Sequence, residues 1–309
     1  MPIETEDTVK ITKKPIHRRK RVILPLLVVL LMVILDLAIV CTTHGGSHRI
    51  EVVTLDHDPV GADPDLITLL TINMAHGRSD GRNQILQSGK TISGNVDAIG
   101  ELIAREKAQV VALQEADAAS WWSGSFSHVN RVAALGNMTS AMQGTNVSGW
   151  GLHYGAAIVT QLEVSDARQI TFPRNVPTFS KGCVVATCAW PGDQSFRFGV
   201  VSLHLDFASA NVRSKQLSVL SDLINEAAMP MIIMGDFNTD MSKSLLPEFV
   251  SQTGLQAWQA EDQSIVTFPA LKARIDWVLA SSEFRMVEQR VLADVLSDHR
   301  ILKAVIGRR

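Results

Sequence analysis

Cysteine is scarce in this sequence, which contains three in 309 residues. An odd and widely spaced set of this size excludes a small secreted scaffold held together by disulfides. Cys183 and Cys188 stand five positions apart in an apolar run that is typical of a strand, so they lie about 16 Å apart, too far to bond. We predict that both are buried thiols.

The sequence also lacks repeats, low-complexity tracts and a large excess of either charge. It has 29 Lys and Arg residues against 31 Asp and Glu, and 46% of its residues are hydrophobic, which excludes disordered and collagen-like chains. Positions 1–43 hold seven of the basic and four of the acidic residues, so the remainder carries a net charge of −5. That balance does not favour binding to nucleic acid through bulk positive charge, although a bound divalent cation can supply positive charge at a phosphate.

Several common catalytic motifs are absent as well. There is no Walker loop, no Gly-x-Ser-x-Gly turn, no Gly-x-Gly-x-x-Gly loop and no Cys/His cluster at zinc spacing. These absences argue against P-loop nucleotide hydrolases, serine hydrolases, dinucleotide-binding enzymes and a zinc site.

Residues 22–40 form a long apolar run, nineteen residues interrupted by one proline and one aspartate, and a helix of this length can cross a bilayer. Seven Lys and Arg residues precede it, whereas Arg49 is the only one between the run and Arg78. Because basic residues stay on the cytoplasmic side, we expect a cytoplasmic tail at 1–21 and a transmembrane helix or uncleaved signal anchor at 22–40. The rest of the chain would then lie outside the cytoplasm, at the cell membrane.

Two alternatives to a membrane span remain open: a cleaved signal peptide, and a lipoprotein signal that ends at Cys41. The second requires a small residue before the cysteine, and Val40 is larger than that. Residues 41–64 are rich in glycine, proline and aspartate, and we expect them to form a polar tether.

Residues 65–309 are predicted to form one α/β domain, because apolar runs typical of strands alternate with amphipathic segments and no linker divides them. Helical spacing of apolar residues predicts one helix through Ile92–Ile103 and another through Val212–Ile224. The predicted strands are Leu66–Ile72, Val110–Leu113, Ala156–Thr160, Cys183–Cys188, Phe198–Leu203, Met231–Met234, Ile275–Leu279 and Ile301–Ile306.

Acidic, amide and imidazole residues follow or interrupt these strands. Any one of them could serve in a turn or in the core, but strand ends of an α/β sheet share one edge, so the set is expected to converge. The oxygen donors among them suit Mg²⁺ or Mn²⁺. The series is Asn73, Gln114-Glu115, His204, Gly235-Asp236-Phe237-Asn238, Arg274-Ile275-Asp276 and Ser297-Asp298-His299.

In its order and its motifs, this series resembles the endonuclease/exonuclease/phosphatase superfamily over residues 66–306. The specific signal is Gly-Asp-Phe-Asn followed by a closing Ser-Asp-His. The resemblance implies an α/β fold of four layers, in which two packed mixed sheets are flanked by helices and the site lies at one end of the sheets. It also implies a hydrolase that cleaves phosphoric esters with Mg²⁺ or Mn²⁺.

The resemblance further implies a role for each matching residue. Asn73, Glu115 and Asp298 would hold the metal, with Glu115 as the main carboxylate. Asp236 would position or deprotonate the attacking water, and Asn238 would hold a phosphate oxygen.

The two histidines of the series also receive roles from the resemblance. His299 would contact the phosphate while Asp276 orients its ring. His204 would be a second phosphate ligand or the acid for the leaving group. These roles agree with the chemistry of in-line attack on phosphorus, which needs donors for the growing charge, a base and an acid.

Weaker candidates for substrate contact lie close to the same strand ends. They are His76, Arg78 and Tyr154. The adjacent Trp121 and Trp122 in a polar loop suggest a platform for a base, sugar or lipid headgroup, and inward packing is the alternative.

The leading hypothesis is a membrane-anchored, divalent-metal phosphohydrolase, a phosphodiesterase or phosphatase, that acts outside the cytoplasm on a lipid headgroup or a small phosphodiester. An extracellular nuclease is the alternative, which the mild acidity of the domain does not favour. A receptor that binds a phosphorylated ligand without turnover would show a gap in the catalytic set, and the series has none.

Overall fold

The computed structural model describes residues 27–28, 30–32, 46–58 and 63–309. No helix within those residues is both long and apolar enough to cross a membrane. The predicted tail at 1–21 and most of the predicted span at 22–40 lie outside the described residues, so both stay predictions.

The domain is built on two mixed β-sheets. Across the first sheet the strands are β1 (Gly46–Arg49), β8 (Val164–Thr171), β9 (Gly182–Trp190), β10 (Asp193–His204), β11 (Met231–Asp236), β13 (Asp276–Ala280) and β12 (Gln256–Ala257). Across the second they are β14 (Phe284–Val291), β15 (Leu302–Arg308), β3 (Leu66–Asn73), β4 (Val110–Asp117), β7 (Leu152–Thr160), β5 (Ser140–Gln143) and β2 (Val53–Thr54), and β6 (Val147–Gly149) pairs with β7. Each sheet contains a central parallel pair, β10 with β11 and β3 with β4.

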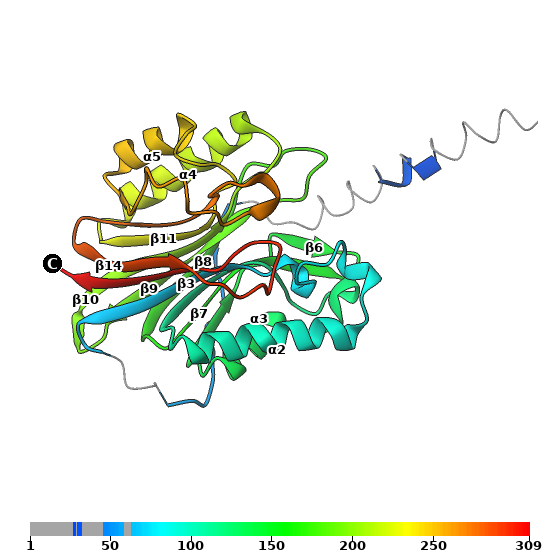
Figure 1. The fold of residues 1–309 in the computed structure, drawn as a ribbon, viewed down its shortest axis with the longest axis horizontal. Coiled ribbons are helices and arrows are strands. Elements are labelled where there is room, and N and C mark those ends of the chain that lie inside the picture. Colours follow the sequence, from blue (N-terminus) through cyan, green and yellow to red (C-terminus); the bar gives the residue numbers. More distant parts are fainter. Residues whose placement is uncertain (1–26, 29, 33–45, 59–62) are drawn as a thin grey trace, which may run out of the picture.

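Helices cover the outer faces of the two sheets, giving four layers (Figure 1). α2 (Gly89–Arg105) and α3 (His128–Leu135) lie on the second sheet, and α4 (Ala210–Ala227) and α5 (Leu245–Thr253) lie on the first. Ser88, Ser127 and Ser209 cap α2, α3 and α4, because each side chain accepts a hydrogen bond from a backbone N–H of the first turn. Short 3₁₀ helices lie at η1 (Ala75–Gly77), η2 (Gln84–Leu86), η3 (Trp121–Ser123) and η4 (Pro269–Leu271).

Three apolar cores separate the four layers. In β10, Phe198 and Val200 belong to the core between the sheets, whereas Val201 and Leu203 belong to the core under α4 and α5. The central strands of the second sheet alternate in the same way between the inter-sheet core and the core under α2 and α3. Both faces of these strands are buried, which is why their sequences are nearly continuous apolar runs.

The prediction of an α/β domain with strands and helices at these positions is confirmed. Cys183 and Cys188 are buried free thiols on β9, as expected. We predicted a polar tether at 41–64. Where the structure describes this segment, it contains the strands β1 and β2, each of which extends one edge of a sheet. Between them, Ile50 and Val52 pack against the inter-sheet core, so a short apolar stretch decides the local structure despite the surrounding glycines and prolines.

Candidate active site

The predicted polar side chains meet at one end of the two sheets. His204, Asp236 and Asp276 occupy one row across β10, β11 and β13. On the second sheet, Asn73 and Gln114 are paired neighbours near the ends of β3 and β4. Asn73 Nδ2 donates a hydrogen bond to Asp236 Oδ2 at 3.1 Å and so links the two sheets. We call this end of the sheets the site end.

Several residues at the site end hold a left-handed backbone. The φ angle is 54° at His76, 49° at Glu115 and 50° at Asn238. Glu115 also lies in a bulge, where the pairing of β4 with β7 slips between Leu113 and Ala116. A bulge redirects a side chain out of the normal alternation, and such conformations persist in non-glycine residues where the surrounding structure enforces them, often at functional sites.

Asp236 is buried at the centre of the cluster. Its Oδ1 accepts a hydrogen bond from the backbone N–H of Asn238 at 2.9 Å, and its Oδ2 accepts one from Asn73. The Nε2 atoms of His204 and His299 lie 3.4 and 3.8 Å from the same Oδ2. Burial raises the pKa of Asp236 to about 7, although the nearby His299 opposes the shift. A carboxylate with this pKa can accept a proton near neutral pH.

The ring of His299 is held by Asp276. Its Nδ1 lies 2.9 Å from Asp276 Oδ2, and the ring packs on Phe268 with 4.6 Å between the centroids. Burial disfavours the charged ring, but the carboxylates of Asp276 and Asp236 outweigh burial and raise the pKa of His299 to about 10. His299 is therefore a cation at neutral pH, which suits a donor to a phosphate oxygen better than a base.

Lys181 contacts His204 directly. Its Nζ lies 3.3 Å from Nδ1 and 3.2 Å from Nε2 of the ring. Burial, together with this ammonium group, lowers the pKa of His204 well below its ordinary value, so the ring is neutral. A neutral ring fits the phosphate-ligand role predicted for His204 better than the role of leaving-group acid.

Glu115 and Asp298 are both held by Arg78. Nη1 of Arg78 lies 3.6 Å from Glu115 Oε2, and Nη2 bonds to Asp298 Oδ2. Burial alone would raise the pKa of Glu115, but neighbouring basic side chains, His76 first among them, hold it well below the usual range. The two carboxylates thus share one guanidinium. Their oxygen donors fit Mg²⁺ or Mn²⁺, which would compete with Arg78 for the position between them.

A second cluster of potential ligand atoms comes from Asp236, Asp276 and His299, whose atoms lie within 4.8 Å of one another. The two clusters point to different cation positions. In the second, however, Asp276 and His299 are already bonded to each other, and Asp236 accepts two hydrogen bonds. Both clusters remain candidate cation sites, and the second also contains the imidazole–carboxylate pair of His299 and Asp276.

His76 forms a second imidazole–carboxylate pair beside the first. Its Nδ1 lies 2.7 Å from Asp117 Oδ2, and its Nε2 lies 3.5 Å from Glu115 Oε2. Asp117 also accepts a hydrogen bond from Trp122 Nε1 at 2.8 Å. Tyr154 packs edge-on against the His76 ring, with 4.7 Å between the centroids. The structure thus brings all three weaker candidates, His76, Tyr154 and the Arg78 that contacts Glu115, to the site end.

Lys181 and Asp117 are site residues that the sequence analysis did not select. Asp117 stands two positions after Glu115 at the end of β4, and a second acidic residue so close to a predicted metal ligand is a usable signal. Lys181 precedes β9 as a single basic residue between Ser180 and Gly182, and no sequence pattern distinguishes it.

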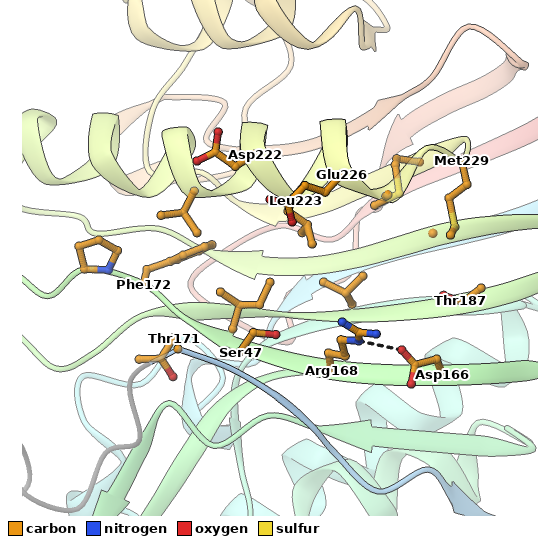
Figure 2. A pocket seen from close by; sticks show the side chains of 18 residues that line it. Ser47, Asp166, Arg168, Thr171, Phe172, Thr187, Asp222, Leu223, Glu226 and Met229 are labelled. Atoms are coloured by element: carbon orange, nitrogen blue, oxygen red, sulfur yellow. Dashed lines mark hydrogen bonds and ion pairs between the residues drawn. The ribbon is translucent and has the colours of Figure 1, made fainter.

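A wide groove lies away from this cluster, between α4 and the strands β1, β8 and β9 (Figure 2). Its volume is about 910 Å³, and Phe172, Leu223 and Met229 contribute to a mostly apolar lining. Arg168 in the groove bonds to Asp166 at 2.9 Å. The lining lacks the convergent polar groups that would orient a phosphoester, so we do not place the site there.

Two packed mixed sheets with acidic and imidazole groups gathered at one end are the arrangement that the resemblance to the endonuclease/exonuclease/phosphatase superfamily implies. The sequence profile of the endonuclease/exonuclease/phosphatase family matches residues 70–299, and the chain belongs to this family. The resemblance drawn from the ordered motifs is therefore confirmed. No curated protein sequence matches the chain.

Solved structures share the fold at low sequence identity. An endonuclease/exonuclease/phosphatase family protein from Leptotrichia buccalis is 18% identical, with a TM-score of 0.61 over 78% of this chain and 99% of that one. The human Nocturnin catalytic domain with bound sulfate is 16% identical, with a TM-score of 0.60 over 84% of this chain and 98% of that one. A mannosyl-6-phosphatase from Bacteroides thetaiotaomicron is 14% identical, with a TM-score of 0.57 over 78% and 99%.

Proposed function

We propose that this protein is a divalent-metal-dependent hydrolase of phosphoric esters that promotes attack of water on phosphorus. The observation that carries the proposal is the set of groups around the Asp236 carboxylate. Asn73 and Asn238 fix its two oxygens, and His204 and His299 lie within 4 Å of one of them. A base that is positioned in this way beside phosphate-binding donors is what in-line displacement requires.

The protein's own groups divide the work of the reaction. Asp236, with its pKa near neutrality, accepts the proton of the attacking water. His299, held as a cation by Asp276, and Lys181 stabilise the charge that grows on the phosphoryl oxygens. His204, with its neutral ring, donates a hydrogen bond to a phosphoryl oxygen.

Glu115 and Asp298 would hold the divalent cation, with Asn73 beside them. When bound, the cation would act as a Lewis acid that withdraws charge from the phosphoryl group. The fit rests on two carboxylates that share one guanidinium, Arg78.

The proposal includes an anchor. The apolar run at 22–40 and the basic residues before it support a membrane span with the catalytic domain outside the cytoplasm.

The proposal is tested with the purified full-length chain on bis(p-nitrophenyl) phosphate, p-nitrophenyl phosphate and plasmid DNA, with Mg²⁺ and with EDTA. We expect hydrolysis of at least one phosphoester, lost with EDTA and restored by excess Mg²⁺. Cleavage of DNA in preference to the small esters would favour the nuclease. Hydrolysis of none of them, while an exogenous phosphorylated ligand still binds, would support a receptor and overturn the proposal.

A further inference from the structure

The chain joins the domain at the site end. Gly46, the first residue of β1, begins a row of paired residues that continues through Thr171, Gly182 and His204 to Asp236. Because neighbouring strands lie about 4.8 Å apart, three spacings place Gly46 about 15 Å from His204. Gly46 therefore lies close to the site, at the same end of the sheets.

The sequence before β1 limits how far the site can lie from the predicted span. The apolar run ends at residue 40, and residues 41–45 connect it to Gly46. Five extended residues reach at most about 18 Å. A bilayer crossed by that run would therefore lie next to the site end, and not next to the opposite end of the sheets.

Loops at the site end expose large apolar side chains, which we call the apolar rim: Trp121, Trp150, Val176 and Phe207, between 58% and 68% exposed. Trp121 begins η3 and the other three stand on separate loops, and Trp121 Nε1 donates a hydrogen bond to Trp150 O at 3.1 Å. Within the described residues, the loops at the opposite end of the sheets carry no exposed large apolar side chain. Those loops expose charged residues, among them Asp65, Lys107, Glu163 and Glu283, and the site end carries exposed charges as well, among them Arg82 and Lys272.

Buried hydrogen bonds fix part of the apolar rim in place. Asp206, which is buried and precedes Phe207, accepts a hydrogen bond from Asn175 at 3.1 Å and one from Thr178 at 3.0 Å. These two donors flank Val176 and so tie its loop to that of Phe207. The exposure of both apolar side chains is therefore built into the loops.

The apolar rim is also continuous with the wall of the site. Phe179, on the same loop as Val176, packs against Trp122 and Tyr154 with centroid distances of 6.4 and 6.0 Å. Trp122 binds Asp117, the partner of His76. A surface that covered the apolar rim would therefore present its polar groups to the catalytic cluster.

We infer that the site end docks on a lipid bilayer and that the substrate is a phosphoester of a lipid headgroup, which rests on the proposed function. A bilayer fits better than a soluble partner for two reasons. Tryptophan has an apolar ring and a polar N–H, a combination favoured at the membrane interface. The five residues between the predicted span and Gly46 also limit how far that span can lie from this end.

A probe on the apolar rim tests the docking. The full-length chain with Cys41→Ser and Phe207→Cys, labelled with an environment-sensitive fluorophore, is reconstituted in phosphatidylcholine vesicles that contain phosphatidylinositol and sphingomyelin. The native Cys183 and Cys188 are buried and do not compete for the label. We expect a blue shift at position 207 and none at a matched control, Val287→Cys, which is exposed on β14.

The same full-length chain gives the functional readout. We expect Trp121→Ser with Phe207→Ser to slow release of headgroup products from the vesicles by about tenfold for each side chain, while hydrolysis of soluble bis(p-nitrophenyl) phosphate stays unchanged. Leu135→Ser with Val287→Ser, two exposed apolar residues away from the site end, should alter neither rate.

The outcomes separate the two proposals. Docking on lipid would be overturned by absence of the blue shift or by equal vesicle rates for the rim and control variants. It would also be overturned by a blue shift that disappears when protein is diluted into more lipid, which would indicate a second copy of the chain as the partner. Loss of hydrolysis on every phosphoester, with the blue shift intact, would instead overturn the proposed function.

Discussion

Two histidines flank Asp236, and they differ in their surroundings. His299 faces both Asp276 and Asp236, which keep it charged. His204 faces Lys181, which together with burial keeps it neutral. Similar side chains thus take different protonation states because their neighbours differ.

The pH dependence of the reaction follows from the charge of His299. In the proposed mechanism its protonated form is the active one, so we expect activity to fall as pH rises through its folded-state pKa of about 10. Replacing Asp276 by Asn removes the carboxylate that supports the cation, so we expect the alkaline limb of kcat/KM to move to lower pH. A pH–rate profile with saturating Mg²⁺ measures this shift. Asp262→Asn, an exposed substitution, serves as the control, and an unmoved limb in Asp276→Asn would contradict the assignment.

Lys181 gives a second prediction at the residue scale. Lys181→Met should lower kcat by about a hundredfold to a thousandfold, the usual effect of removing one donor to the transition state. Lys181→Arg should keep more of the rate, because it retains the charge. Steady-state kinetics on a soluble phosphodiester decides the matter, and a Met variant with the wild-type kcat would exclude Lys181 from the chemistry.

At the scale of elements, the strands were predictable where both faces are buried. Val200 and Val201 illustrate this, since each faces a different core and the run is apolar throughout. β1 and β2 were not predicted, because edge strands of two to four residues gain their structure from backbone pairing that no composition records. The same limit applies to the site: the ordered motifs located Asp236 and His299, whereas Lys181 depends on tertiary packing alone.

The core between the sheets sets the distance between the two halves of the site. Ile232 of β11 lies fully buried in this core. Ile232→Ala should lower the free energy of unfolding by about 2–5 kcal/mol, through lost burial and the cavity left behind. Urea denaturation measures the change, with the exposed Ser282→Ala as a control near zero. A loss below about 1 kcal/mol would mean that the two sheets repack without difficulty.

At the scale of the whole molecule, acidic groups from both sheets gather at one end, and a divalent cation that binds the folded state alone would stabilise it. We expect Mg²⁺ to raise the Tm of the full-length chain with increasing concentration. Glu115→Gln should remove most of this rise, whereas Glu226→Gln, in the groove of Figure 2, should leave it unchanged. A Tm that is equally independent of Mg²⁺ in all three proteins would argue against a metal site at Glu115.

The turnover of Asp236→Asn tests the central claim most directly. The pKa of Asp236 is raised by burial, so its ionised form destabilises the fold and the Asn variant should keep or increase the Tm. With Mg²⁺ present and the fold intact, we predict that kcat on the phosphoester hydrolysed by the wild type nearly vanishes. A folded Asp236→Asn protein that retains the wild-type kcat would contradict the account.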